Sequence, residues 1–238
     1  MALGNPLADN FRADDFAKYR STRLAAGISA NNLNREQAYL RAVFNELARL
    51  GLWKGENPLA KVRQVKIAER ELSFLSLEQM RLLLNALDGD ARLVAKVCLA
   101  TGARWSEAEG LRMVQVHGGQ LHFSGTKSGK NRSVPVSDAL IAELNAHVVS
   151  GSERFFKYSY GAFREGVTKA GLSLPKGQLT HVLRHTFASH FVMNGGNGLV
   201  LQKILGHASL TMTMRYAHLA PDHLQEAKAF NPLARLEA

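Results

Sequence analysis

The sequence has little of what secreted, fibrous or membrane-spanning proteins require. It contains a single cysteine, Cys98, so no disulfide can form within the chain. Its apolar runs are interrupted by charge well short of the ~20 apolar residues that a membrane-spanning helix needs. The first residues lack the basic-then-apolar order of a secretory signal, and the chain shows no internal repeat or low-complexity tract. We therefore expect a soluble protein of the cytoplasm.

The hydrophobic content and the net positive charge of the sequence favour a folded protein with an anionic partner. The 238 residues are 46% hydrophobic, enough for one large domain or two small ones with real cores. Thirty Lys and Arg against twenty Asp and Glu leave a net charge of +10, which favours nucleic acid or an acidic surface. Residues 154–221 carry eight basic side chains and one acidic side chain, Glu165. We expect the anion to be held there.

The first part of the chain is predicted to be a small helical domain followed by a linker. In residues 1–53, apolar residues recur at helical spacing up to Gly51, but two helices are too few for a self-sufficient core. Residues 54–72 combine a proline, mixed charge and weak periodicity, which predicts an interdomain linker whose basic residues could also touch phosphate. Residues 73–238 form the second predicted domain.

The second domain alternates between helical and strand patterns. Ser76 and Gln79 form a capping-box pattern that opens a helix, and the next helix is expected to end at Gly102. Residues 113–136 change to short alternating runs around a Gly-Gly turn and a polar tip, which predicts a three-stranded antiparallel meander. Helical periodicity then returns. The predicted fold class is mainly α with a small three-stranded antiparallel β-sheet (α+β), in two domains.

Six polar residues at predicted helix ends, turns and faces carry the chemistry. Singly, each has an ordinary explanation: a capping arginine, a polar turn, a half-buried histidine, a core aromatic. Together, two arginines, a lysine and two histidines form a cationic cradle for the non-bridging oxygens of one phosphodiester. One tyrosine hydroxyl can then form a covalent phosphoryl intermediate, which points to strand transfer without hydrolysis. The six are Arg104, Lys127, His181, Arg184, His207 and Tyr216.

These residues stand in segments that resemble the tyrosine recombinases of the phage integrase family. That family is recognised by T-G-x-R-x-x-E-x-x-x-L, a lysine in a β-turn, an H-x-x-R helix, an L-G-H segment and a downstream tyrosine. The first segment is Thr101-Gly102-Ala103-Arg104 with Glu107 and Leu111, the second has Lys127, the third His181 with Arg184, the fourth Leu205-Gly206-His207, and the fifth Tyr216. Lys130 flanks the same turn as Lys127, and the resemblance favours the first of the two lysines.

The resemblance covers residues 73–238 as a catalytic domain, and less specifically residues 1–53 as a partial helical core-DNA-binding domain. The usual domain begins with one further helix, so a truncated chain is expected. By resemblance, the partners are double-stranded DNA core sites and three further copies in a homotetramer, joined by exchange of residues 219–238. In a free monomer that segment could instead fold back on its own domain. Accessory DNA-bending or excisionase proteins are further expected partners. Neither a cofactor nor a metal is implied.

The resemblance also implies a mechanism in which Tyr216 attacks the scissile phosphate. The products are a 3′-phosphotyrosyl link and a free 5′-hydroxyl, which lets the enzyme integrate or excise a mobile element such as a prophage. The implied roles are phosphate binding for Arg104 and Arg184, protonation of the leaving oxygen for Lys127, acid–base catalysis or charge stabilisation for His181, hydrogen bonding to phosphate for His207, and orientation of an active-site partner for Glu107.

The sequence allows three other interpretations. A metal hydrolase could use His181 and His185, which are four residues apart as in H-E-x-x-H, but position 182 is valine and no acidic residue lies nearby in the chain. A non-catalytic DNA-binding or transposition-regulating protein could keep the same fold, although the intact set of active-site residue types argues against it. A type IB topoisomerase shares the covalent chemistry, but its usual domain arrangement is not evident.

Overall fold

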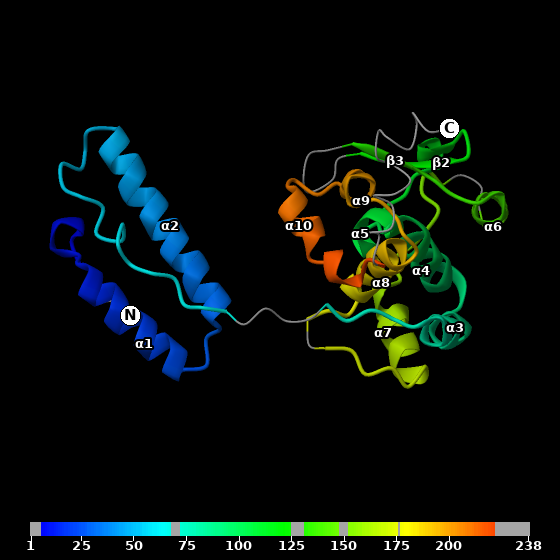
Figure 1. The fold of residues 1–238 in the computed structure, drawn as a ribbon, viewed down its shortest axis with the longest axis horizontal. Coiled ribbons are helices and arrows are strands. Elements are labelled where there is room, and N and C mark those ends of the chain that lie inside the picture. Colours follow the sequence, from blue (N-terminus) through cyan, green and yellow to red (C-terminus); the bar gives the residue numbers. More distant parts are fainter. Residues whose placement is uncertain (1–5, 68–71, 125–130, 148–151, 176, 222–238) are drawn as a thin grey trace, which may run out of the picture. The chain divides into compact units, whose positions relative to one another are not determined.

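The computed structural model describes residues 6–67, 72–124, 131–147, 152–175 and 177–221. The chain divides into two compact units, Met1–Glu71 and Leu72–Ala238 (Figure 1). No helix among the described residues is long and apolar enough to cross a membrane.

The first unit is built on two helices. A short 3-10 turn, η1 (Ala8–Asn10), precedes α1 (Ala13–Ala25) and α2 (Ala30–Arg49). Ser29 caps α2 by accepting a hydrogen bond from the backbone N–H of Asn32. The buried residues of its core are Phe11, Phe16, Phe44 and Leu59. The two expected helices are present.

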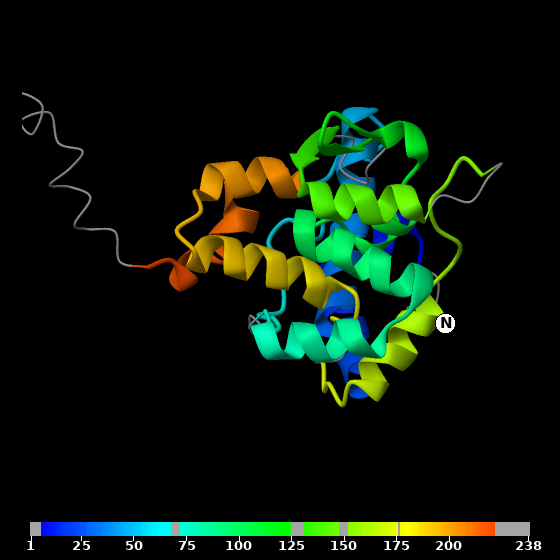
Figure 2. The same cartoon turned by 90° about the vertical axis from the view of Figure 1, so that its right-hand side faces the viewer.

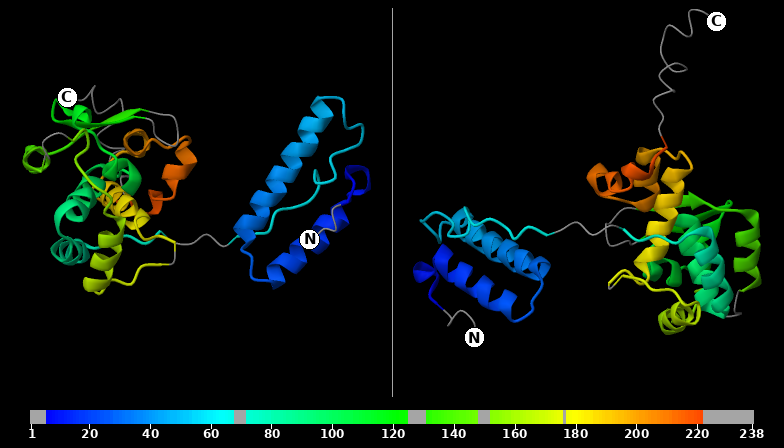
Figure 3. Two further views of the ribbon diagram at one scale, coloured as in Figure 1. Left: turned by 180° about the vertical axis from the view of Figure 1, so that it is seen from behind. Right: turned by 60° about the horizontal axis from the view of Figure 1, so that its bottom comes forward.

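The segment predicted as a linker, 54–72, belongs in large part to the first unit. The carbonyls of Leu59 and Ala60 accept hydrogen bonds from the Arg41 guanidinium, and the side chain of Leu59 is fully buried. Further along, Asn34 bonds to both backbone groups of Val65. Figure 3 shows this chain running back along α2. Backbone groups of this segment are hydrogen-bonded by side chains of α2. The segment therefore does not need the regular apolar spacing of a helix or strand, and its sequence looks like that of a linker.

The second unit is mainly helical with a small sheet. Its helices are α3 (Leu77–Ala86), α4 (Gly89–Thr101), α5 (Trp105–Glu109), α6 (Asp138–Ala146), α7 (Tyr160–Lys169), α8 (His181–Met193), α9 (Gly198–Leu205) and α10 (Leu210–Met214), with 3-10 turns η2 (Met113–Gln115) and η3 (Ala217–Leu219). Helix α4 packs against α3, α5, α6, α7 and α8 (Figure 2). Most residues of α4 are buried, as its apolar sequence requires.

Two predicted helix boundaries are confirmed by their caps. Ser76 and Gln79 form the reciprocal capping box at the start of α3. Helix α4 ends at Gly102, whose φ of 66° is the left-handed conformation that glycine adopts without strain. A Cβ there would lie 2.5 Å from Leu205 and 2.6 Å from Phe187. Glycine at this position therefore sets both the end of α4 and the close approach of α8 and α9.

The predicted antiparallel meander is present, with a shorter first strand than expected. Its strands are β1 (Val116–His117), β2 (Gln120–Phe123) and β3 (Arg132–Pro135), in the order β1-β2-β3. Residues 113–115, predicted as strand, form η2 instead, because the Gln115 side chain bonds to the backbone N–H of Arg112 and to the carbonyl of His122. In β3, Arg132 and Val134 alternate inward. The predicted fold class is confirmed.

Candidate active site

Arg104 lies where α4 meets α5. It is the N-cap residue of α5, two positions after Gly102. Its backbone N–H donates to Glu107 Oε2 at 3.0 Å, and its guanidinium Nη1 donates to Glu107 Oε1 at 2.9 Å. Because Glu107 bonds both the backbone and the side chain, the guanidinium is held in one direction at the start of α5.

Glu107 also accepts a hydrogen bond from a second arginine, Arg132 of β3. Arg132 Nη2 lies 2.5 Å from Glu107 Oε2, and the Arg132 side chain is only 4% exposed. Burial raises the pKa of the Glu107 carboxyl, but hydrogen bonds from Arg132 and Arg104 outweigh that effect and hold the pKa below its usual range. A buried carboxylate therefore joins Arg104 to the sheet.

Arg184 is the most deeply held cation of the site. It lies on α8 and is 5% exposed. Its Nη1 donates to the carbonyl of Gly102 and its Nη2 to the carbonyl of Leu205, both at 2.8 Å. These carbonyls end α4 and α9, where the helix dipole is negative. Burial, with the charges of Arg104 and Arg132, lowers the pKa of Arg184 to about 10, so it stays cationic at neutral pH.

The two predicted histidines differ in burial. His181 is the first residue of α8 and is exposed, and partial burial of its ring, with the charges of Arg184 and Arg104, lowers its pKa. His207 follows the left-handed Gly206 at the end of α9 and is 7% exposed. Its Nδ1 lies 2.8 Å from Thr213 Oγ1. Burial, then Arg184, lowers the pKa of His207 to about 4.

Tyr216 lies directly before η3 and is 3% exposed. Its ring belongs to a buried cluster with Ala188, Val192, Leu201 and Leu205 of α8 and α9. Its hydroxyl lies 2.7 Å from Nδ1 of His185. Burial raises the pKa of Tyr216, and the positive charges of Arg184 and Arg215 oppose that rise. The phenol is therefore protonated at neutral pH and lies within the field of the arginines.

The structure brings six of the seven predicted site residues into one electrostatically coupled group. Arg104 and Arg184 lower the pKa of His207, and Tyr216 and Glu107 act on Arg184. His181 is coupled to the same two arginines from the start of α8. Lys127, and the alternative Lys130, lie outside the described residues.

Three residues of the site were not predicted in these roles. Arg132 was missed, although an arginine at an inward position of an alternating strand is a sequence signal of a buried ion pair. His185 was considered only as a metal ligand, whereas it bonds the Tyr216 hydroxyl. Thr213, which bonds His207, has no signal in the sequence. Among the described residues, no group of three His, Cys, Asp or Glu is placed to bind a metal.

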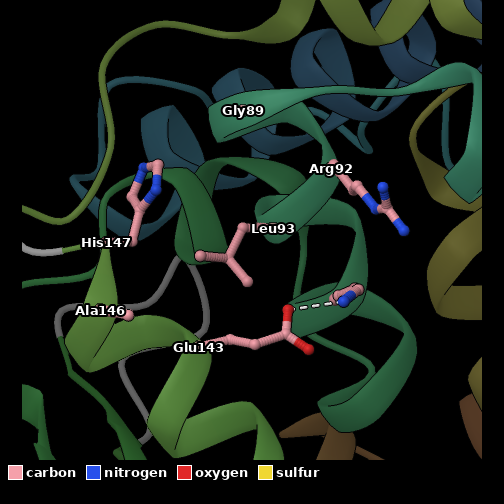
Figure 4. Close-up of a pocket in the computed structure, with 7 residues that line it drawn as sticks. Gly89, Arg92, Leu93, Glu143, Ala146 and His147 are labelled. Atoms are coloured by element: carbon pink, nitrogen blue, oxygen red, sulfur yellow. Dashed lines mark hydrogen bonds and ion pairs between the residues drawn. The ribbon is translucent and has the colours of Figure 1, made fainter.

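A separate cavity of about 360 Å³ lies between α4 and α6 (Figure 4). The Lys96–Glu143 ion pair, at 2.5 Å, crosses it, and His147 pairs with Asp90 nearby at 2.5 Å. Both pairs connect α4 to the end of α6. None of the residues predicted for chemistry lines this cavity, and both contacts have a structural role in joining the two helices.

The Phage integrase family profile matches residues 73–223, and the profile described as "Phage integrase, N-terminal domain" matches residues 1–66. The chain belongs to the phage integrase family. The integrase of Escherichia phage 186 is 49% identical over 247 residues, covering 98% of this chain and 73% of the relative. The integrase of Haemophilus phage HP1 is 51% identical over 244 residues, covering 98% and 71%. The resemblance inferred from the five motifs is confirmed.

Solved structures agree with this assignment. The catalytic domain of the bacteriophage HP1 integrase superposes with a TM-score of 0.64 at 53% identity, covering 69% of this chain and 98% of that domain. A lambda integrase dimer bound to a COC′ core site has a TM-score of 0.70 at 20% identity, covering 89% of this chain and 85% of that one. The second likeness concerns the fold alone. This integrase is a site-specific recombinase of the tyrosine type.

Proposed function

We propose that this integrase cuts and rejoins DNA through a 3′-phosphotyrosyl bond to Tyr216. The single observation that carries the proposal is that the buried Arg184 is electrostatically coupled both to Arg104 and to Tyr216. Two guanidinium groups in one electrostatic field are costly without an anion, and each presents donors in the fork geometry that phosphate oxygens accept. A phosphodiester bound there lies beside a hydroxyl nucleophile.

The arginines stabilise the charge that grows on the non-bridging oxygens during phosphoryl transfer, which is the largest catalytic contribution in such reactions. Arg184 is held by two helix-end carbonyls and Arg104 by Glu107, so neither guanidinium reorganises as the reaction proceeds. In this proposal Glu107 orients Arg104 directly. The site would then be preorganised before DNA arrives.

The remaining roles follow the motifs. Lys127 protonates the leaving 5′-oxygen, with Lys130 as the alternative. His181 acts in acid–base catalysis or charge stabilisation. His207, whose Nδ1 faces Thr213, presents Nε2 as a hydrogen-bond donor to the phosphate. The bond energy is kept in the phosphotyrosine, so a 5′-hydroxyl of the partner strand can reseal it without a metal or a nucleotide cofactor.

The proposed partner is double-stranded DNA carrying core recombination sites. The net charge of +10 and the basic stretch 154–221 favour that partner, and relatives of the same fold are described as bound to DNA, among them XerH on palindromic difH. We propose that residues 1–53 contribute core-site binding and residues 73–238 catalysis. We further propose a homotetramer on DNA, exchange of residues 219–238 between subunits, accessory bending or excisionase proteins, and action in the bacterial cytoplasm.

A nicked suicide duplex tests the proposed chemistry. The core site is first selected from a random duplex library by binding, and the nick is then placed so that cleavage releases a short strand and traps the covalent product. The wild-type protein should give an adduct that survives denaturing electrophoresis. Tyr216→Phe, which removes only the hydroxyl, should bind the duplex and give none. Chelator should leave the adduct unchanged; loss of adduct in chelator, or adduct formation by Tyr216→Phe, contradicts the proposal.

A further inference from the structure

His185 is the only residue, among those that the structure describes, that bonds the Tyr216 hydroxyl. Its Nδ1 lies 2.7 Å from the phenolic oxygen, and the two rings are inclined at 44° with centroids 6.1 Å apart. His185 is on α8, directly after Arg184, so the residue that faces the nucleophile and the residue proposed to bind phosphate share one helical turn.

The direction of this hydrogen bond can be deduced. A neutral imidazole has one protonated and one unprotonated nitrogen. If Nδ1–H donated to the phenolic oxygen, the phenolic proton would have no acceptor among the described residues, in a side chain that is 3% exposed. A buried, unsatisfied donor is costly. The phenol therefore donates to Nδ1, and the histidine proton is on Nε2.

The surroundings keep His185 in the neutral form that can accept a proton. The groups facing it are His181 and Arg184 on its own helix, Arg215 and Tyr216 from the end of α10 and the start of η3, and His207 after α9. Burial, then the charges of His181, Arg215 and Arg184, lower the pKa of His185 to about 4. Without a bound anion, a cationic form at this position would be repelled by its neighbours, so His185 is neutral before a phosphodiester binds.

We propose that His185 positions the Tyr216 hydroxyl and accepts its proton during DNA cleavage. The inference rests on the proposed role of Tyr216 as nucleophile. As the phenolic oxygen forms its bond to phosphorus, its proton moves to His185 Nδ1. The bond from phosphorus to the 5′-oxygen breaks with its electron pair, and that oxygen takes a proton from the general acid. On rejoining, His185 returns its proton to the phenolic oxygen.

His181 is the competing proton acceptor, since it lies one helical turn before His185. The two rings are 6.3 Å apart between centroids, and the hydrogen bond to Tyr216 is made by His185. His181 is exposed at the start of α8, where bound DNA would meet it. The geometry therefore assigns the phenolic proton to His185 and leaves His181 to the phosphate side.

His185→Asn separates proton acceptance from positioning. The amide oxygen can take the place of Nδ1 as a hydrogen-bond acceptor, but it does not take up a proton. Single-turnover cleavage of the nicked duplex by this variant should slow about 100-fold or more while binding is retained. The wild-type rate should level off with rising pH once His185 is neutral, whereas the variant's rate should keep rising because it depends on the phenolate.

Three comparisons decide the outcome. A fluorinated tyrosine at position 216, with its lower phenol pKa, should restore more activity to His185→Asn than to the wild type. His181→Asn should keep the levelled pH profile. Cleavage by His185→Asn at the wild-type rate and with the wild-type profile would overturn the proposal, as would loss of the levelled profile in His181→Asn alone. Absence of any adduct in the wild-type protein would instead overturn the proposed function itself.

A measurement on the wild-type protein tests the proposal even if a variant fails to fold. Nitrogen-15 NMR of the histidine rings distinguishes the two neutral tautomers and the cation. In the wild-type protein at neutral pH, His185 should show an unprotonated Nδ1 and a protonated Nε2, and Tyr216→Phe should change the Nδ1 signal. A protonated Nδ1 in the wild-type protein would overturn the proposal.

Discussion

Arg41 in the first unit and Arg184 in the second both donate hydrogen bonds to backbone carbonyls, but their surroundings differ. Each guanidinium donates to backbone carbonyls far away in the chain: Arg41 to Leu59 and Ala60, Arg184 to Gly102 and Leu205. Arg41 joins an extended segment to a helix. Burial, and then the charges of Arg104 and Arg132, lower the pKa of Arg184 to about 10. The difference indicates that the proposed phosphate site is distinguished by positive charges that lie close together, and not by an arginine bonded to carbonyls.

The largest expected effect is on the cleavage rate, which should fall in Arg184→Lys but not in Arg41→Lys. Arg184→Lys keeps the charge but loses the planar fork, and removing one stabilising donor from a transition-state site costs about 100- to 1,000-fold in rate. Arg41→Lys should leave the cleavage rate unchanged. Single-turnover cleavage of the nicked duplex measures both. Equal rates for the two variants would mean that the buried arginine cluster has no catalytic role.

The next largest effect is on the free energy of unfolding, and it compares two glutamates that form ion pairs, Glu107 and Glu56. Glu107→Gln breaks a buried pair and leaves Arg132 without its charged partner, so the free energy of unfolding should fall by about 3 kcal/mol or more. Glu56→Gln breaks the exposed pair with Lys61, which should change it by about 0.5 kcal/mol or less. Urea unfolding followed by Trp105 fluorescence in a Trp53→Phe background reports on the second unit, and the converse background reports on the first. A small loss in Glu107→Gln would contradict the ion-pair assignment.

Two glycines after helices give a third comparison. Gly51 has a φ of 72° and open space around an added Cβ, so Gly51→Ala should cost about 1–2 kcal/mol from the left-handed backbone alone. Gly102 has a similar φ, but its Cβ would meet Leu205 and Phe187, which adds about 1–3 kcal/mol for overpacking. Gly102→Ala should also slow cleavage, because its carbonyl holds Arg184. Urea unfolding and single-turnover cleavage of both variants test this comparison. A smaller loss of stability in Gly102→Ala than in Gly51→Ala would contradict it.

The last comparison concerns the pH dependence of stability in the two units. The pKa values of His185 and His207 are lowered to about 4 in the folded protein from an ordinary 6.5, so the unfolded chain binds more protons at mildly acidic pH. The contribution of these two histidines to stability is present above pH 6.5 and is lost as pH falls toward 4. Residues 1–71 contain no histidine. Between pH 6.5 and 5, the Trp105 signal should therefore show falling stability and the Trp53 signal should show little change. A parallel loss in both units would contradict this account.

What the sequence could predict was local. The H-x-x-R pair, the helix end at Gly102 and the antiparallel meander each depend on residues a few positions apart, and each is found where it was expected. The site residues were expected to lie together, but the individual contacts across long separations were not predicted: Arg184 reaches Gly102 across 82 positions, and His185 reaches Tyr216 across 31. Such contacts depend on how α8 packs between the ends of α4 and α9, and no local pattern encodes that packing. The segment predicted as a linker depends on distant contacts in the same way, since the chain after α2 is held by side chains of that helix.

Tyr216 is proposed to be the residue that forms the covalent phosphotyrosyl bond to DNA beside the buried arginines. Mass spectrometry of the trapped adduct after nuclease and trypsin digestion tests it most directly. Trypsin cuts after Arg215, so Tyr216 begins its own peptide, whereas Tyr158 and Tyr160 fall together on the peptide that follows Lys157. The account predicts a nucleotide phosphate on the peptide that starts at Tyr216 and on no other. A modified peptide containing Tyr158 and Tyr160 would contradict it.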